Sequence, residues 1–197
     1  LLIHSNDVAT KAYAADTIGS VALDHATEAG EAGSIVPLVA LLRLDNTHAR
    51  MTAGKALAAL AAGSKVNQDS IKIAGGIELL VSLLKPEEAK VEEVQSRAAG
   101  ALADLAKNNK ENQQAITECG GIKPLILLVT ESSHDQPKVD ASRLLWSLSE
   151  KNFTNQKAIA DAGGIEALVR LVGTTSDKVQ VSGAIASLAL DNEVNLS

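Results

Sequence analysis

Apolar positions along the chain recur in three kinds of segment, and the same three segments return several times. A short segment with apolar residues at helical spacing runs into a glycine turn, a Leu-rich run follows, and an Ala-rich segment comes last. The isoleucines that follow the turns lie 42, 45 and 43 residues apart, at Ile35, Ile77, Ile122 and Ile165. That spacing lies within the ~40–47 residue period of two- and three-helix repeats. The pattern predicts an all-α stack of repeats.

The first segment of each repeat is predicted to be a short helix. Asn-Gln pairs open it at Asn67, Asn112 and Asn155, and a glycine pair follows it. Asparagine is a favourable N-cap because its side chain accepts hydrogen bonds from the free amides of the first turn, and glycine ends a helix by adopting a positive φ. We therefore expect these three asparagines to cap the first helices.

The second and third segments are predicted to be a buried helix and a longer Ala-rich helix. Pro37 and Pro124 stand near the start of two second segments, where a missing amide costs little. The third segments carry apolar anchors three residues apart on one helical face. Their copies lie at 14–22, 53–61, 98–106, 141–149 and 181–189. The link at 85–93 carries four glutamates and is predicted to be a solvated loop, with an acidic contact site as the second interpretation.

The organisation is expected to be one continuous array over residues 1–197, because a repeat too small to bury its own apolar face is stabilised by its neighbours. We expect a partial repeat at 1–23, repeats at about 26–63, 67–108, 112–151 and 155–192, and a truncated repeat from 195. The repeat at 26–63 has no Asn-Gln pair, so its first helix is expected to be distorted or reduced to a turn.

The chain opens at Leu1 without Met and reads as a piece cut from a longer protein. Such a piece is expected to lack polar capping helices at its ends. The faces near residues 1–2 and 188–190 are then expected to expose apolar surface, which favours end-to-end self-association.

Composition narrows the classes of function. Hydrophobic residues make up 46% of the chain and aromatic residues 2%, so the core is expected to consist of Ala, Leu, Ile and Val in closely approaching helices. The formal net charge of −6 argues against a nucleic-acid partner, since proteins that bind phosphate backbones carry clustered excess Lys and Arg. No uninterrupted apolar run reaches the ~18 residues of a membrane span.

The single cysteine, Cys119, takes the place that Ala74 and Ala162 hold before the glycines. A small buried residue is the favoured interpretation, since free cysteine usually behaves as a small hydrophobe, and a reactive thiol is the alternative. One cysteine forms no internal disulfide, which favours a reducing intracellular setting, cytoplasmic or nuclear.

The sequence lacks the usual catalytic and metal-binding arrangements. The histidines fall in predicted loops or near element ends, without metal-ligand spacing, at His4, His25, His48 and His134. Gly54-Lys55 does not form a phosphate loop, because Ala56 follows where Ser or Thr is needed. We therefore expect no enzymatic activity, no cofactor and no metal.

The recurring turn resembles that of the armadillo-repeat family, whose unit has an Ala-Gly-Gly-Ile type turn before a Leu-rich second helix and an Ala-rich third helix. The turn occurs at 74–77 and 162–165, and at 119–122 with Cys119 in the first place. The resemblance covers essentially residues 8–195 and implies a right-handed superhelical α-solenoid of three-helix repeats. Two-helix HEAT repeats are the structural alternative, and the Asn-Gln pair with its glycine turn favours armadillo.

The resemblance also implies a concave groove lined by the third helices, where well-known members carry Asn just before the final Leu anchor and Trp four residues earlier. None of the matching positions is Asn or Trp in this chain. Helical spacing nevertheless places five sets of side chains on one stripe. The predicted groove residues are Tyr13, Asp16, Ser20, Thr52, Lys55, Ala59, Arg97, Gly100, Asp104, Asp140, Arg143, Trp146, Ser147, Gln180, Gly183 and Ser187.

The cations of this stripe are expected to bind acidic side chains of a partner. Arg97 and Arg143 can form bidentate contacts with carboxylates, and Lys55 supplies a point charge. The alternative is pairing within the chain, for instance of Asp140 with Arg143, because such helix pairs are common.

Two glycines and the tryptophan raise separate questions of packing. Gly100 and Gly183 are expected to leave room for partner side chains. Trp146 lies beside the apolar anchors, so it is either a core residue or a groove anchor of the kind found in binding hot spots.

The leading hypothesis is a non-catalytic scaffold that binds a peptide or helical segment of another protein in the third-helix groove. The alternative is an architectural or spacer segment of a larger multidomain protein, in which the stack mainly sets distances between other parts.

Overall fold

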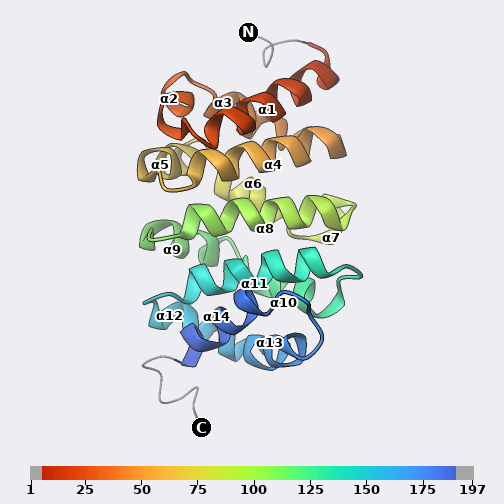
Figure 1. Cartoon of the computed structure of the whole chain (residues 1–197), viewed down its shortest axis with the longest axis vertical. Coiled ribbons are helices and arrows are strands. Elements are labelled where there is room, and N and C mark those ends of the chain that lie inside the picture. Colours follow the sequence, from red (N-terminus) through yellow and green to blue (C-terminus); the bar gives the residue numbers. More distant parts are fainter. Residues whose placement is uncertain (1–5, 190–197) are drawn as a thin grey trace.

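The computed structural model describes residues 6–189, and regular structure within that range is entirely helical (Figure 1). The first helices are α2 (Ala26–Glu31), α5 (Lys65–Ile73), α9 (Lys110–Glu118) and α12 (Phe153–Asp161). The second helices are α3 (Ile35–Leu41), α6 (Gly76–Ser82), α10 (Ile122–Glu131) and α13 (Gly164–Val172). The third helices are α1 (Val8–Ala22), α4 (Thr47–Ala61), α8 (Glu92–Ala106), α11 (Asp135–Ser149) and α14 (Lys178–Ala189).

The third helices stack side by side through the molecule. In Figure 1, α1, α4, α8 and α11 lie one below another, and the first helices α5, α9 and α12 follow one edge. Each third helix contacts the next, from α1 to α14. Small residues permit this close approach, since a Cβ placed on Gly19 would lie 3.1 Å from the Cα of Ala56. We call the surface formed by these five helices the third-helix face.

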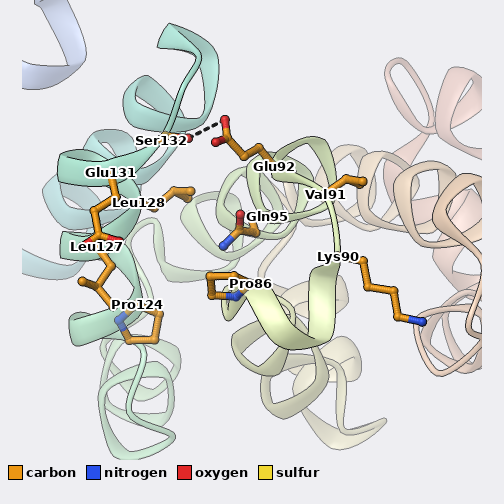
Figure 2. Close-up of a pocket in the computed structure, with 10 residues that line it drawn as sticks. All are labelled: Pro86, Lys90, Val91, Glu92, Gln95, Pro124, Leu127, Leu128, Glu131 and Ser132. Atoms are coloured by element: carbon orange, nitrogen blue, oxygen red, sulfur yellow. Dashed lines mark hydrogen bonds between the residues drawn. The ribbon is translucent and has the colours of Figure 1, made fainter.

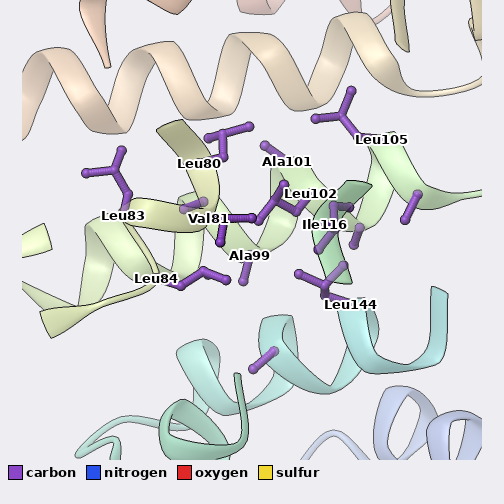
Figure 3. Close-up of a cluster of buried hydrophobic side chains, with 14 of the residues drawn as sticks. Leu80, Val81, Leu83, Leu84, Ala99, Ala101, Leu102, Leu105, Ile116 and Leu144 are labelled. Atoms are coloured by element: carbon purple, nitrogen blue, oxygen red, sulfur yellow. The ribbon is translucent and has the colours of Figure 1, made fainter. Parts of the chain in front are cut away.

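One apolar core runs through the stack. Leu57, Leu102 and Leu145, from successive third helices, are fully buried in the same cluster of side chains. Figure 3 shows part of this cluster, where Leu80 and Val81 of α6 gather around Leu102 of α8. The core thus consists of aliphatic side chains, as the low aromatic content predicts.

The glycine turn uses its two glycines for different reasons. Gly75 has φ 78°, a left-handed conformation that favours glycine, and it separates α5 from α6. Gly76 is needed for space, because a Cβ there would lie 2.6 Å from Cγ2 of Ile71. The repeat at 26–63 has Ser34 instead, and its hydroxyl donates a hydrogen bond to the carbonyl oxygen of Ala29. That repeat also has the shortest first helix described, six residues in α2 against nine in α5, so the expected reduction is present but stops short of a turn.

The predicted acidic loop at 85–93 is in part a helix and is tied to its neighbours. α7 (Pro86–Ala89) forms within it, and the carbonyl oxygen of Glu88 accepts a hydrogen bond from Nη1 of Arg50 at 2.7 Å. Nζ of Lys90 forms an ion pair with Asp45 at 2.6 Å. The predicted solvated loop is confirmed in that most of the link is exposed, but the link also contains a helical turn and is bound by polar partners from the preceding repeat.

The asparagines expected to cap the first helices do not cap them. Each first helix begins two residues earlier, and the N-caps are Ser64, Asn109 and Asn152, whose side chains accept hydrogen bonds from the backbone amides of Asn67, Asn112 and Asn155 respectively. The predicted caps are instead buried side chains. Nδ2 of Asn67, for example, donates to the carbonyl oxygen of Leu60 at 2.9 Å, at the end of the preceding third helix.

The neighbouring glutamines join one repeat to the next. Nε2 of Gln68 donates to the carbonyl oxygen of Ala61 in the preceding repeat, at 3.3 Å, and to that of Asp104 in its own repeat, at 2.9 Å. Its Oε1 accepts a hydrogen bond from Nδ2 of Asn109. Gln113 repeats this arrangement with Ser147. These amides therefore fix the position of each third helix relative to its neighbour.

Two predictions about burial were wrong. Cys119 is exposed at the C-cap of α9. The desolvation that remains at this position, together with the charges of Glu78 and Glu118, raises the pKa of its thiol. Leu188, expected to expose apolar surface at the C-terminal end, is buried. The predictions about residues 1–2, His4, residue 190 and a repeat from 195 lie outside the described residues.

Candidate partner-binding face

The predicted stripe lies on the third-helix face, but its residues differ in exposure. Tyr13 is 70% exposed and packs edge-on against His48 on the next third helix, with 6.0 Å between the ring centroids. Thr52 is only 7% exposed, and its hydroxyl donates to the carbonyl oxygens of His48 and Ala49. Gly100 is buried as well. The other predicted groove residues, which are Asp16, Ser20, Lys55, Ala59, Arg97, Asp104, Asp140, Arg143, Trp146, Ser147, Gln180, Gly183 and Ser187, are partly or fully exposed.

Lys55 and Arg143 already have partners within the chain, on the preceding third helix. Nζ of Lys55 lies 2.8 Å from Oδ1 of Asp16, and this contact lowers the pKa of the Asp16 carboxyl. Nη1 of Arg143 lies 3.1 Å from Oδ1 of Asp104. Pairing within the chain was the alternative interpretation, and it applies to both cations. The partner suggested for Arg143 was wrong, since Asp140 accepts a hydrogen bond from the hydroxyl of Ser96 instead.

Asp104 is a largely buried acid of the face. Burial raises the pKa of its carboxyl, and the Arg143 guanidinium opposes that rise. Nη2 of Arg143 also donates to the carbonyl oxygen of Gly100 at 2.9 Å. The arginine therefore binds both the backbone and the side chain of α8, which makes it part of the contact between two repeats.

Arg97 is the exception among the predicted groove cations. Its side chain is exposed and makes no ion pair or hydrogen bond with any residue in the described range. Its stem lies against α4, since a Cβ placed on Gly54 would be 3.2 Å from the Cβ of Arg97. The guanidinium is thus held on the third-helix face with its hydrogen-bond donors available.

The space expected above Gly100 and Gly183 is filled by side chains of the protein itself. A Cβ on Gly100 would lie 3.2 Å from Nη2 of Arg143. A Cβ on Gly183 would lie 2.6 Å from Cε3 of Trp146. The space above each glycine is therefore occupied by a side chain of α11, Arg143 at Gly100 and Trp146 at Gly183, and neither position offers room to a partner.

Trp146 combines the two roles that the sequence left open. Its ring packs on Gly183 and against the core, yet the residue remains partly exposed. Two cavities share it as a wall. One, of about 440 Å³, is lined also by Asp104, Arg143 and Ser147. The other, of about 550 Å³, is lined also by Phe153 of α12.

Sequence reasoning missed the residues at the junctions between the third helices and the following first helices that border these cavities. Lys107 lines the smaller cavity, and Lys110, Lys151 and Phe153 line the larger one. The pattern that could have revealed them is the scarcity of aromatic residues, because two of only three lie within eight positions, at Trp146 and Phe153.

A further cavity, of about 220 Å³, lies where α8 begins, between α7 and α10 (Figure 2). Glu92 borders this cavity, and its carboxylate accepts hydrogen bonds from the Ser132 hydroxyl and the Ser133 amide, both at 2.8 Å. Nδ1 of His134 lies 3.1 Å from the same carboxylate. The Ser133 amide is the main cause that lowers the pKa of Glu92 to about 2. These bonds connect the start of α8 to the loop before α11, so the role of Glu92 is to stabilise the packing of two successive repeats.

Within residues 6–189, no group of His, Cys, Asp and Glu side chains is arranged to hold a metal ion. In the same range no helix combines the length and the apolar character needed to cross a membrane.

The fold of the chain is similar to that of several solved engineered and designed proteins. No family model and no curated protein matches the chain. Among solved structures, an engineered protein is similar with 33% identity and a TM-score of 0.88, over 95% of this chain and 76% of that chain. Computationally designed armadillo repeat proteins for modular peptide recognition are similar with 25% identity and a TM-score of 0.81, over 95% and 78% of the two chains.

A designed armadillo repeat protein in complex with the peptide (KR)4 has 25% identity and a TM-score of 0.87, over 98% of this chain and 82% of that chain. The three-helix units, the glycine turns and these likenesses define a right-handed superhelical α-solenoid. The chain is thus an armadillo-like repeat protein, which decides against the HEAT alternative.

Proposed function

We propose that the chain is a non-catalytic scaffold that binds a peptide or helical segment of a partner protein on the third-helix face. The observation that carries the proposal is the pair of cavities that share Trp146 on this face. Concave, partly apolar sites of ~300–1,000 Å³ with a few polar groups are typical of ligand binding. The free guanidinium of Arg97 lies on the same face.

The similar designed proteins support a peptide as the class of partner, because one group was designed for peptide recognition and another was solved with a bound peptide. We further propose that the chain requires no cofactor and does not bind nucleic acid, in line with its net charge of −6. The intracellular setting and end-to-end self-association remain predictions from the sequence.

One observation favours the alternative, a spacer segment of a larger protein. Lys55 and Arg143 are engaged by Asp16 and Asp104, so these charges serve contacts between repeats. A surface whose charges are satisfied internally has less to offer a partner. The two functions therefore need an experiment that blocks the face without changing the stack.

The variant Ser147→Trp is expected to block the third-helix face without changing the stack. Ser147 lines the 440 Å³ cavity, and its side chain makes no hydrogen bond in the described structure. The added ring blocks the face whatever the charge of the ligand. Thr130→Trp, on the exposed surface of α10, is the matched control. Peptides selected from a random display library are measured against both variants by fluorescence anisotropy. We expect the first variant alone to weaken binding at least tenfold, and equal binding to both would refute the scaffold function.

A further inference from the structure

The larger cavity on the third-helix face is an apolar site with a fixed aromatic wall. Trp146 has little room to move toward α14, because even a Cβ placed on Gly183 would lie 2.6 Å from its ring. Phe153, the first residue of α12, lines the same cavity and is 58% exposed. Rigid aromatic side chains that remain partly exposed are typical binding anchors, since little conformational freedom is lost when a ligand covers them.

The size of the cavity suits one bulky apolar side chain together with the backbone that carries it. Its volume of about 550 Å³ falls within the ~300–1,000 Å³ of ligand sites. Covering Phe153 and Trp146 would remove apolar surface from water at roughly 25 cal/mol per Å². An aromatic or large aliphatic side chain of a partner is the group that gains most from this site.

The charges around the cavity are positive, although the whole chain is negative. Lys110 and Lys151 line the apolar cavity, and Lys107 lines the neighbouring one. All three side chains are exposed, and none forms a salt bridge within residues 6–189. Glu150 is the one acid that lines both cavities and lacks a salt bridge in that range.

The remaining acid of this region does not offset the lysines. Asp104 is paired with Arg143, so the two charges largely cancel. Arg97, on the preceding part of the face, adds another unpaired cation. Complementary charge steers association and disfavours partners of like charge, so a basic peptide is opposed at this site.

We propose that the partner segment of the third-helix face is an acidic peptide with one bulky apolar side chain, which inserts between Trp146 and Phe153 while flanking carboxylates meet Lys110 and Lys151. This inference rests on the proposed scaffold function and specifies its ligand. It also separates this chain from the designed protein that was solved with the basic peptide (KR)4.

The first test is the composition of the peptides selected from the random library. We expect the enriched peptides to carry Asp or Glu within a few residues of Phe, Trp, Leu or Met. One such peptide is then labelled and compared with two derivatives, one with the bulky residue replaced by Ala and one with the acids replaced by Asn and Gln. Each derivative should bind about tenfold more weakly, a difference of ~1.4 kcal/mol.

The second test uses variants of the protein. Phe153→Ala should weaken the parent peptide about tenfold and leave its Ala derivative unaffected, while Ile73→Ala, at an 84% exposed site on α5, is the control. The double variant Lys110→Glu and Lys151→Glu should weaken the acidic peptide and remove the salt dependence of its binding. Lys85→Glu with Lys123→Glu is its control, because both lysines are exposed and unpaired in the described structure.

The outcomes distinguish the inference from the function on which it rests. Enrichment of basic or uncharged peptides whose binding is blocked by Ser147→Trp would overturn the acidic ligand and leave the scaffold function intact. Peptides insensitive to Ser147→Trp would overturn both. Sedimentation that shows a dimer of the free protein, abolished by Phe153→Ala, would mean that a second copy occupies the cavity and would overturn the peptide assignment.

Discussion

Gln68 and Asp104 are 36 residues apart in the sequence, and Nε2 of Gln68 donates a hydrogen bond to the backbone carbonyl oxygen of Asp104 at 2.9 Å. Asp104 lies on the third-helix face, whereas Gln68 belongs to the first helix of the same repeat and also donates to Ala61, at the end of the preceding third helix. The bond therefore sets where one third helix stands relative to the next. Gln113 makes the equivalent bond to Ser147, beside the cavities of the proposed site.

Gln113→Ala is expected to destabilise the protein by about 2–4 kcal/mol. The change removes donors to the carbonyl oxygens of Ala106 and Ser147 and the acceptor of Nδ2 of Asn152. Each buried group left without a partner costs ~1–3 kcal/mol. The measurement is urea unfolding followed by circular dichroism. Gln114→Ala, at the exposed neighbour, should change stability by no more than ~0.5 kcal/mol, and equal effects at the two positions would contradict the role of the buried amide.

The sequence predicted the repeat, its three helices and the glycine turn, because each of these depends on contacts close along the chain. The helical spacing of apolar residues and the positive φ of Gly75 are local properties. The role of the Asn-Gln pairs was not accessible in this way, since Gln68 joins the third helix of the preceding repeat to that of its own repeat, 36 residues further along the chain. The N-caps that the structure shows could have been recognised in the sequence, because a Ser or Asn stands three residues before each pair, at Ser64, Asn109 and Asn152.

The candidate site was predicted only in outline. Helical spacing placed the stripe on one face, but it could not say that Arg143 reaches Asp104 across 39 residues, or that Trp146 fills the space above Gly183. Those contacts depend on how closely two third helices approach. Exposure of Cys119 was missed for a related reason, since burial at a helix end depends on which neighbour covers it.

Glu92 provides a prediction about pH. Its folded-state pKa, about 2, lies below the ordinary value of 4.5, so its contribution to stability is present above pH ~4.5 and is lost as the pH falls towards 2. Glu92→Gln should therefore destabilise the protein by about 1–2 kcal/mol at pH 7, and the difference from the parent should shrink at pH 3. Urea unfolding at both pH values measures this.

The neighbouring Glu93→Gln is the control for Glu92, because Glu93 is exposed and makes no salt bridge in the described structure. Its effect should stay within ~0.5 kcal/mol at both pH values. A difference between the parent and Glu92→Gln that is constant from pH 7 to pH 3 would show that the carboxylate charge does not act through the Ser133 amide.

Gly183→Ala tests whether the ring of Trp146 packs directly on Gly183. Alanine is favoured over glycine in a helix by ~1 kcal/mol, so the substitution would stabilise α14 if the site were open. Because the new Cβ would fall 2.6 Å from the indole ring, we expect a net loss of about 1–2 kcal/mol instead. Trp146 is the only tryptophan of the chain, so its fluorescence emission should shift as the ring is displaced. Ser182→Ala is the exposed control, and a stabilised Gly183→Ala protein would contradict the contact.

Arg143→Ala tests whether the ion pair across α8 and α11 is structural. Removing the guanidinium leaves the Asp104 carboxyl partly buried without its counter-charge, so the pKa of Asp104 should rise further above its ordinary value. A raised carboxyl pKa stabilises the folded state only at low pH, and this contribution is lost as the pH rises through the folded-state pKa. We expect a loss of about 1–2 kcal/mol at pH 7, smaller than for a fully buried pair because both side chains are partly exposed.

The double variant Arg143→Ala with Asp104→Asn separates the charge from the packing. If the unpaired carboxylate causes the loss, adding Asp104→Asn should restore part of the stability at pH 7, and Arg143→Ala alone should recover as the pH is lowered towards 4. Urea unfolding of the four proteins of this cycle gives the coupling free energy. A coupling near zero would mean that Arg143 acts only through its hydrogen bond to Gly100, and its guanidinium would then be free to leave Asp104 for a partner carboxylate.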